Sequence, residues 1–311
     1  MTHSSRGPIF IGGSGRCGTT VLANTLGRHP GIFTFPDELR MLTAGSENLI
    51  DWMHSPQNLH LKAALRQNLR GGFFSRASLS ELVRSPRGAS FGALYRKLQL
   101  GSYFSRPVAR NDEEVGLCRS VDRHHYQRAV DEFLATFPGG SIQERRNQIQ
   151  EFIDACAEDP LRRVGAARWC DGTPDNVFHM LDLADIFPGA KFVHIIREGR
   201  GVARSFYRLG WSPSTTAALR RWHHAVAVGR ALGEELGPEQ YLEVSFETLL
   251  ADAERTLRTI VTFVGEDWRA ELEQHEITRA AVTPSGDDLD DDLDRLFAAL
   301  ASDLANDFGW T

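Results

Sequence analysis

The stretch 12-GGSGRCGTT-20 decides how this chain folds, because it combines four glycines with serine and threonine over nine positions. It overlaps the end of the apolar run 8-PIFIGG-13, which predicts a buried strand, and it leads into 19-TTVLANTLGRH-29, which predicts a helix. A strand, a glycine-rich turn and a helix in this order present backbone N–H groups at a helix N-terminus, where anions bind. We therefore expect a phosphate-binding turn.

The turn departs from the best-known phosphate-binding motif. The spacing from Gly13 to Gly18 matches a Walker A loop, which continues with lysine and then serine or threonine. This chain has Thr19 and Thr20 there instead, and it carries the cation Arg16 inside the loop. A P-loop kinase or nucleotidase is disfavoured but stays open as an alternative, and so does a tight turn without a ligand.

Strands and helices alternate along the rest of the chain. The segments 191–196 and 240–245 predict strands, and each is followed by a helical pattern, over 199–209 and 246–265. The stretch 173–189 predicts a further helix, with Thr173 as its N-cap and Pro174 at its first position. This alternation predicts an α/β fold with three layers, P-loop-like, around a central parallel sheet.

One segment interrupts the alternation. Between about residues 45 and 160 the pattern is mostly helical, including a helix that begins at Ser141 with Glu144 as its capping-box partner. We found neither an internal repeat nor a clear linker. We therefore expect a single domain over 1–311 with a helical insertion at about 45–160.

Composition excludes several classes of protein. The formal net charge of −6 over 311 residues argues against a nucleic-acid partner, which usually requires a basic stripe. Neither a signal peptide nor a membrane-spanning apolar run is visible, so we expect a cytoplasmic protein without a membrane partner. The four cysteines show no CxxC pair or regular spacing, so we expect no metal site and no disulfide framework.

Two motifs together resemble the sulfotransferases that use 3′-phosphoadenosine 5′-phosphosulfate (PAPS). The first family motif reads roughly P-[KR]-S-G-T-T, and 15-GRCGTT-20 is similar to it, with Cys17 at the serine position. The second is a strand followed by an arginine and, eight residues later, a serine, which Arg197 and Ser205 supply. Further matches at 28–38, 171–176, 244–252 and 260–265 extend the resemblance over most of the chain, and the likeness is best to the bacterial and tyrosylprotein-type branch.

The resemblance implies a donor site. Arg16 is expected to face the bridging oxygen of the sulfate, and Arg197 and Ser205 are expected to bind the 3′-phosphate. An arginine at a strand end suits this role because its guanidinium makes bidentate charged contacts with phosphate. The 5′-phosphate falls to the loop residues Gly13, Ser14, Gly15, Arg16, Cys17, Gly18, Thr19 and Thr20.

The resemblance also implies a catalytic base. In the similar branch a glutamate shortly after the first helix takes the proton of the acceptor hydroxyl, and Glu38 occupies that place beside Asp37. One alternative is that Asp37 is the base instead, and another is that both carboxylates only cap a helix starting near Leu39. Reserve candidates are the histidines, since cytosolic relatives use one: His179, His194, His223 and His224.

This chain also departs from the family pattern. Many relatives have DKTP where this chain has DGTP, so Gly172 cannot supply that lysine, and the role is left to Arg168 or another arginine. Val21 and Phe246 stand where cytosolic relatives have the tryptophan and tyrosine that hold adenine. Cys17 adjoins Arg16 at a helix N-terminus, where we expect its thiol pKa to be lowered.

The predicted activity is a metal-independent, in-line transfer. A sulfuryl group moves from PAPS to a hydroxyl of a small molecule or glycan, leaving 3′-phosphoadenosine 5′-phosphate (PAP) as product. The insertion at about 45–160 is expected to shape the acceptor site. Besides the kinase or nucleotidase, a PAP-binding protein that has lost catalysis remains an alternative. The sequence predicts neither the acceptor's identity nor the oligomeric state.

Overall fold

The centre of the molecule is a sheet of five parallel strands. The computed structural model describes residues 6–45, 48–55, 91–107, 114–137, 139–274, 277 and 291–310, so the parts of the expected insertion at 56–90 and 108–113 lie outside the described residues. In spatial order the strands are β2 (Ile32–Thr34), β5 (Arg168–Asp171), β1 (Ile9–Gly12), β6 (Lys191–Ile196) and β7 (Tyr241–Ser245). The predicted parallel α/β class is confirmed.

The central strands are apolar on both faces. In β1, Ile9 and Ile11 join one hydrophobic cluster, whereas Phe10 joins another on the opposite side. Because successive strand side chains point to opposite faces, the continuous apolar run Ile9–Ile11 fills both clusters. In β6, Val193 and Phe192 divide in the same way.

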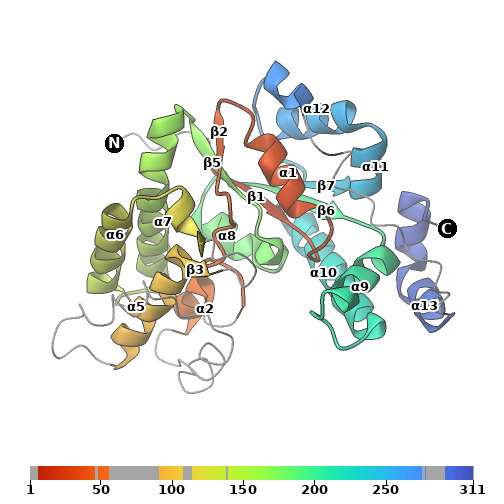
Figure 1. The fold of residues 1–311 in the computed structure, drawn as a ribbon, viewed down its shortest axis with the longest axis horizontal. Coiled ribbons are helices and arrows are strands. Elements are labelled where there is room, and N and C mark those ends of the chain that lie inside the picture. The colour runs from red at the N-terminus through yellow and green to blue at the C-terminus, as the bar shows by residue number, and fades with distance from the viewer. Residues whose placement is uncertain are drawn as a thin grey trace.

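Helices cover both faces of this sheet (Figure 1). One face packs against α1 (Thr19–Leu26), α11 (Phe246–Ala251) and α12 (Ala253–Phe263), and η3 (Ala270–Gln274) follows them. The other face carries α8 (Met180–Ile186), α10 (Thr215–Leu236) and α7 (Ile142–Val164). The result is the three-layer arrangement that the sequence predicts.

The helical segment adds a lobe beside the sheet, at the left of Figure 1. Its helix α7 begins at Ser141, whose side chain and that of Glu144 form the predicted capping box. Lobe and sheet share one hydrophobic cluster, which includes Phe10 of β1 and Phe152 of α7. The remaining elements of the lobe are α2 (Leu49–His54), α5 (Phe91–Phe104), β3 (Arg106–Pro107), β4 (Glu114–Val115), η1 (Leu117–Arg119) and α6 (Arg123–Thr136).

A third cluster joins helices beyond the β7 side of the sheet. Here α9 (Gly199–Arg208), α10 and α13 (Asp291–Phe308) pack around Trp222, which contacts Phe297. Arg200 forms an ion pair with Asp294, which ties α9 to α13. Over the described ranges, none of the helices is long and apolar enough to cross a membrane.

Two predicted helices are divided. The segment 173–189 forms η2 (Pro174–Phe178) and then α8, and Thr173 caps neither with its side chain. The segment 246–265 breaks at Asp252, whose side chain accepts the backbone N–H of Arg255 and so caps α12. At Asp252 a polar side chain therefore competes with a continuous helix.

Candidate functional site

The expected site residues meet at the carboxyl edge of the sheet. The glycine-rich turn follows β1, Arg197 follows β6, Glu38 follows β2, and Asp171 ends β5. Because all these strands are parallel, their carboxyl ends lie at one edge, and ligands of open α/β sheets bind there. Topology therefore brings together residues from four distant parts of the sequence.

The turn after β1 has the backbone of an anion site. Gly15 and Gly18 have φ values of 81° and 103°, in the left-handed region that glycine adopts without steric cost. Helix α1 starts at Thr19 without a capping side chain, so the positive end of its dipole is open to an anion. The N–H of Gly13 instead donates to the carbonyl of Pro174 at 3.0 Å, which anchors the turn to η2.

Three side chains of this turn point inward. Cys17 is fully buried, and a Cβ placed on Gly13 would lie 2.5 Å from its sulfur. Burial raises the pKa of the Cys17 thiol, so the expected lowering is wrong: desolvation outweighs the hydrogen bonds that favour the thiolate. Ser14 and Thr19 are buried as well.

Arg16, Arg197 and Ser205 form one hydrogen-bonded group. The Nε of Arg16 donates to the hydroxyl of Ser205 at 3.1 Å, and Arg197 donates to the carbonyl of Arg16 at 3.2 Å. The guanidinium of Arg16 also lies over the ring of Trp211, 5.6 Å from its centroid. The two motifs thus meet at the carboxyl ends of the neighbouring strands β1 and β6. Their two guanidinium groups lie on one exposed face.

The turn that carries Arg197 packs against Trp222 of α10. The indole N–H of Trp222 donates to the carbonyl of Arg197 at 2.9 Å, and a Cβ on Gly199 would lie 2.7 Å from the Trp222 ring. The Arg197 guanidinium lies over Phe246, 4.9 Å from the ring centroid. These contacts fix where the Arg197 side chain starts and along which surface it runs.

Glu38 lies beside α1, in a turn that follows β2. Its carboxylate accepts from the hydroxyl of Thr20 at 3.5 Å and from the guanidinium of Arg40 at 3.4 Å. Asp37 turns the other way, toward the backbone N–H of Gly116 and the side chain of Arg119. No helix starts at Leu39 in this described stretch, so the helix-capping alternative is wrong.

Comparison with known proteins bears on these observations. A model of the sulfotransferase family matches residues 8–270, a range that includes both motifs and Glu38. The chain belongs to the sulfotransferase family. Among curated relatives, the protein-tyrosine sulfotransferase of Drosophila melanogaster is 25% identical over 162 residues, which is 50% of this chain and 32% of the relative. Protein-tyrosine sulfotransferase A of Caenorhabditis elegans is 26% identical over 36% of this chain and 31% of the relative. The matches thus span about a third of each curated relative's length.

Solved sulfotransferase structures are also similar to this chain. The sulfotransferase domain of the Synechococcus PCC 7002 olefin synthase has a TM-score of 0.48 and 21% identity, over 89% of this chain and 80% of that domain. The sulfotransferase STF9 of Mycobacterium avium has a TM-score of 0.46 and 14% identity, over 97% and 76% of the two chains.

Within this sulfotransferase-family chain, Arg168 does not replace the family's DKTP lysine. Arg168 is the first residue of β5 and therefore lies at the opposite edge of the sheet. It is buried, donates to the carbonyls of Val264 and Gly7, and lies 3.7 Å from Glu266. The speculation that it stabilises the transferring group is wrong, because a residue at the amino end of a parallel strand faces away from the site.

The reserve histidines are placed apart from Glu38. His194 lies inside the sheet, bonded to the hydroxyl of Tyr241, and burial lowers its pKa to about 3. His179 separates η2 from α8, and its pKa is lowered mainly by burial. His224 stacks on Phe178. In the described part of the chain, the side-chain partners of His194 and His224 are Tyr241 and Phe178, and not Glu38.

Sequence reasoning missed three residues at this edge. Asp171 and Thr173 bind the backbone of the Glu38 turn, and Trp211 lies against Arg16. The family-like stretch 171–176 was a signal for the first two, but it was interpreted as a helix start. Trp211, with 63% of its surface exposed, had no signal in the sequence, since exposure cannot be recognised from a single tryptophan.

Proposed function

We propose that this chain transfers a sulfuryl group from PAPS to a hydroxyl of a small molecule or glycan, in line and without a metal ion. Family membership supports sulfate transfer in general. The donor, the acceptor class and the roles of single residues are our proposal. The carrying observation is the group formed by Arg16, Arg197 and Ser205 beside the open N-terminus of α1.

The chemistry of this group fits a donor with two phosphate positions. Helix α1 offers backbone N–H groups for the 5′-phosphate, and Arg16 offers positive charge beside it. Arg197 and Ser205 offer a guanidinium and a hydroxyl for the 3′-phosphate, a pairing that makes charged hydrogen bonds. Thr19 and Thr20 in place of the Walker A lysine favour this donor over a nucleoside triphosphate.

Glu38 is the proposed general base. Its carboxylate lies at the same edge, in contact with Thr20 on the first turn of α1. It would take the proton of the acceptor hydroxyl as the oxygen attacks sulfur, while PAP departs. A phenolic hydroxyl belongs in the acceptor screen, because the curated relatives are protein-tyrosine sulfotransferases by name.

The test is a thermal-shift titration with PAP, with adenosine 5′-phosphate and with ATP plus Mg²⁺. A ligand that binds only the folded state raises Tm, and at equal concentration the tighter ligand raises it more. We expect PAP alone to give the largest shift. Arg197→Ala should weaken PAP binding about 10- to 100-fold, the worth of one charged hydrogen-bonded contact, and leave adenosine 5′-phosphate nearly unchanged. Arg208→Ala, at an exposed arginine that ends α9, the helix following Arg197, is the matched control.

Each alternative has its own outcome. A shift with ATP and Mg²⁺ but not with PAP would indicate a kinase or nucleotidase. A shift with PAP but no sulfuryl transfer to any screened acceptor would indicate a PAP-binding protein without catalysis. Equal losses of PAP and adenosine 5′-phosphate in Arg197→Ala would contradict the 3′-phosphate assignment.

A further inference from the structure

The turn that carries Glu38 has an unfavourable backbone. Glu38 and Arg40 have φ values of 64° and 41°, and neither is glycine. A left-handed conformation is unfavourable for a residue with a Cβ, because the Cβ crowds the following carbonyl oxygen. Two such residues, separated only by Leu39, persist only where the surrounding structure holds them.

Two side chains from the stretch after β5 hold this turn. One carboxylate oxygen of Asp171 accepts the backbone N–H of Leu39 at 2.8 Å. The hydroxyl of Thr173 accepts the next backbone N–H, that of Arg40, at 3.2 Å, and donates to the same Asp171 oxygen at 3.0 Å. Consecutive amides of the turn are thus bound by residues two positions apart in β5 and its continuation. We call Asp171 and Thr173 the clamp.

The clamp is fixed in its turn to the glycine-rich strand. The second oxygen of Asp171 accepts from the amide of Asn176 at 2.9 Å, and that amide lies 3.3 Å from the carbonyl of Ile11 in β1. The carbonyl oxygen of the Asn176 side chain accepts from Thr43 at 2.9 Å. One buried polar network therefore joins the end of β1 to the Glu38 turn, at Leu39 and Arg40, and to Thr43 beyond it.

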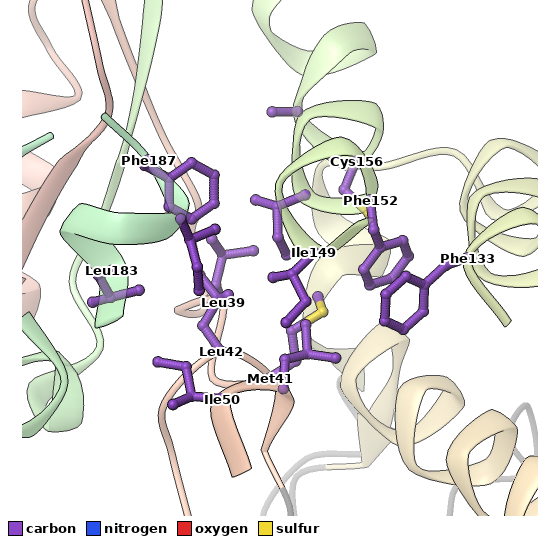
Figure 2. Close-up of a cluster of buried hydrophobic side chains, with 14 of the residues drawn as sticks. Leu39, Met41, Leu42, Ile50, Phe133, Ile149, Phe152, Cys156, Leu183 and Phe187 are labelled. Carbon is purple, nitrogen blue, oxygen red and sulfur yellow. The ribbon is translucent and has the colours of Figure 1, made fainter. Parts of the chain in front are cut away.

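Apolar packing holds the same turn from its inner side. Leu39 is 1% exposed and belongs to the cluster that the sheet shares with the helical lobe. Figure 2 shows Leu39, Met41 and Leu42 between Phe187 at the end of α8 and Ile149 of α7. With Leu39 directed into the core and its N–H bound to Asp171, Glu38 is left on the outer side, toward α1.

The ionised form of Asp171 suits this network, because Leu39, Thr173 and Asn176 all donate to it. Asp171 is completely buried, which raises the pKa of its carboxyl group, and these donors act in the opposite direction. A buried carboxylate with every oxygen occupied is costly to place and rigid once placed. Such a group is suited to define a backbone conformation.

We propose that Asp171 and Thr173 are positioning residues that set the Glu38 carboxylate against α1 by holding the amides of Leu39 and Arg40. This inference rests on the proposed function, in which Glu38 is the general base. The polar groups of the clamp bond to the amides of the turn and to Asn176, so the clamp acts through the backbone of the turn. A base displaced by about 1 Å can lose on the order of 100-fold in rate, which sets the expected size of the effect.

Thr173→Val is the deciding variant. It keeps the shape of the side chain and removes both the acceptor for the Arg40 N–H and the donor to Asp171. We expect kcat to fall about 10- to 100-fold while the PAP-induced rise in Tm stays near the wild-type value. Thr173→Ser, which keeps the hydroxyl, should restore kcat. Thr256→Val, a buried threonine on α12 that bonds to backbone carbonyls, is the matched control and should leave kcat unchanged.

Amide hydrogen exchange at Leu39 and Arg40 gives a second measurement that does not depend on activity. Thr173→Val should speed exchange at these two amides at least about 10-fold and leave those of β6 unchanged. If Thr173→Val does not fold, Thr173→Ala replaces it, because water can enter the space of the lost hydroxyl.

The outcomes are distinct. Faster exchange at both amides with a selective fall in kcat supports the clamp. An unchanged kcat, or a fall in kcat matched by a loss of PAP binding, overturns it, since the network would then serve stability alone. A wild-type protein that neither binds PAP nor turns over PAPS contradicts the proposed function, and unchanged exchange in the variant would separately overturn the clamp.

Discussion

The two turns at the carboxyl edge reach left-handed backbone in different ways. The turn after β1 places Gly15 and Gly18 on either side of Arg16, which itself has a φ of 56°, so glycine encodes two of its three left-handed positions where they occur. The turn after β2 uses Glu38 and Arg40, and the acceptors that hold it lie more than 130 residues away in the sequence. A glycine turn can be recognised in a sequence, whereas a clamped turn cannot.

The proposed function gives a reason for this difference. A phosphate-binding turn needs its backbone close to the ligand, so glycine is the suitable residue there. A turn that presents a carboxylate needs a side chain at the left-handed position itself, so glycine is excluded at residue 38. The second turn must therefore be stabilised by groups outside it, here Asp171 and Thr173.

The largest expected effect concerns the side chain that the clamped turn presents. Glu38→Gln keeps the shape of the residue and removes its ability to take a proton. Turnover should fall about 100- to 10,000-fold, the usual contribution of general base catalysis, with PAP binding unchanged. Steady-state rates with PAPS and a thermal shift with PAP measure the two quantities.

Asp37→Asn is the matched control for this variant. Asp37 bonds to Gly116 and Arg119 of the helical lobe, so its loss should cost about 1 kcal/mol of stability and leave turnover within a few-fold. A Glu38→Gln enzyme within a few-fold of wild type would remove Glu38 from the mechanism and make the clamp a purely structural feature.

A smaller expected effect is a pH dependence of folding stability that comes from His194 of β6, the strand next to β1. His194 pairs in register with Gly12, and burial, with a further contribution from Arg230, lowers its pKa from 6.5 to about 3. Between these values the unfolded chain binds a proton that the folded chain does not. Stability from this group is therefore full above pH 6.5 and falls as the pH falls toward 3, by at most about 1.4 kcal/mol per pH unit.

Urea unfolding at several pH values measures this slope. His194→Gln should flatten it between pH 6.5 and 4, whereas His124→Gln, at an exposed histidine of α6, should keep the wild-type slope. Asp171 in the clamp contributes with the opposite sign, because burial raises its pKa. Parallel slopes for His194→Gln and the wild type would show that acid does not act through the sheet beneath the glycine turn.

Elements with a clear local pattern were predicted from the sequence, whereas elements without one were missed. The strand–turn–helix at 8–29 and the placement of Arg197 and Ser205 were predicted, because local apolar patterns and spacing specify them. The strands β2 and β5 were missed, since they are only three and four residues long and begin or end in polar residues. Short strands carry too little pattern to be recognised alone.

The errors at the site share one cause. The pKa of Cys17 and the role of Arg168 were both inferred from neighbours in sequence, but burial and strand direction decided them. Thr173 was expected to cap a helix, whereas its hydroxyl binds a backbone amide of the Glu38 turn. Contacts between distant segments outweigh local preference wherever a polar group is buried.

The smallest predicted effect is a difference in stability between two variants of Arg40, a left-handed residue of the Glu38 turn. Arg40→Gly and Arg40→Ala both remove the guanidinium, but only alanine must keep a Cβ at a φ of 41°. The glycine variant should be more stable by about 1 kcal/mol, measured by urea unfolding. At Arg128, an exposed residue within α6, the order should reverse, because alanine is the better helix former.

Gly18→Ala extends the same test to the other turn. It should lose stability, since its φ is 103° and the new Cβ would lie 2.6 Å from the Phe246 ring. If Arg40→Ala proves as stable as Arg40→Gly, the left-handed conformation at residue 40 is not a cost that the clamp offsets. The two turns would then differ in sequence only, and Thr173→Val should leave the amides of Leu39 and Arg40 as protected as before.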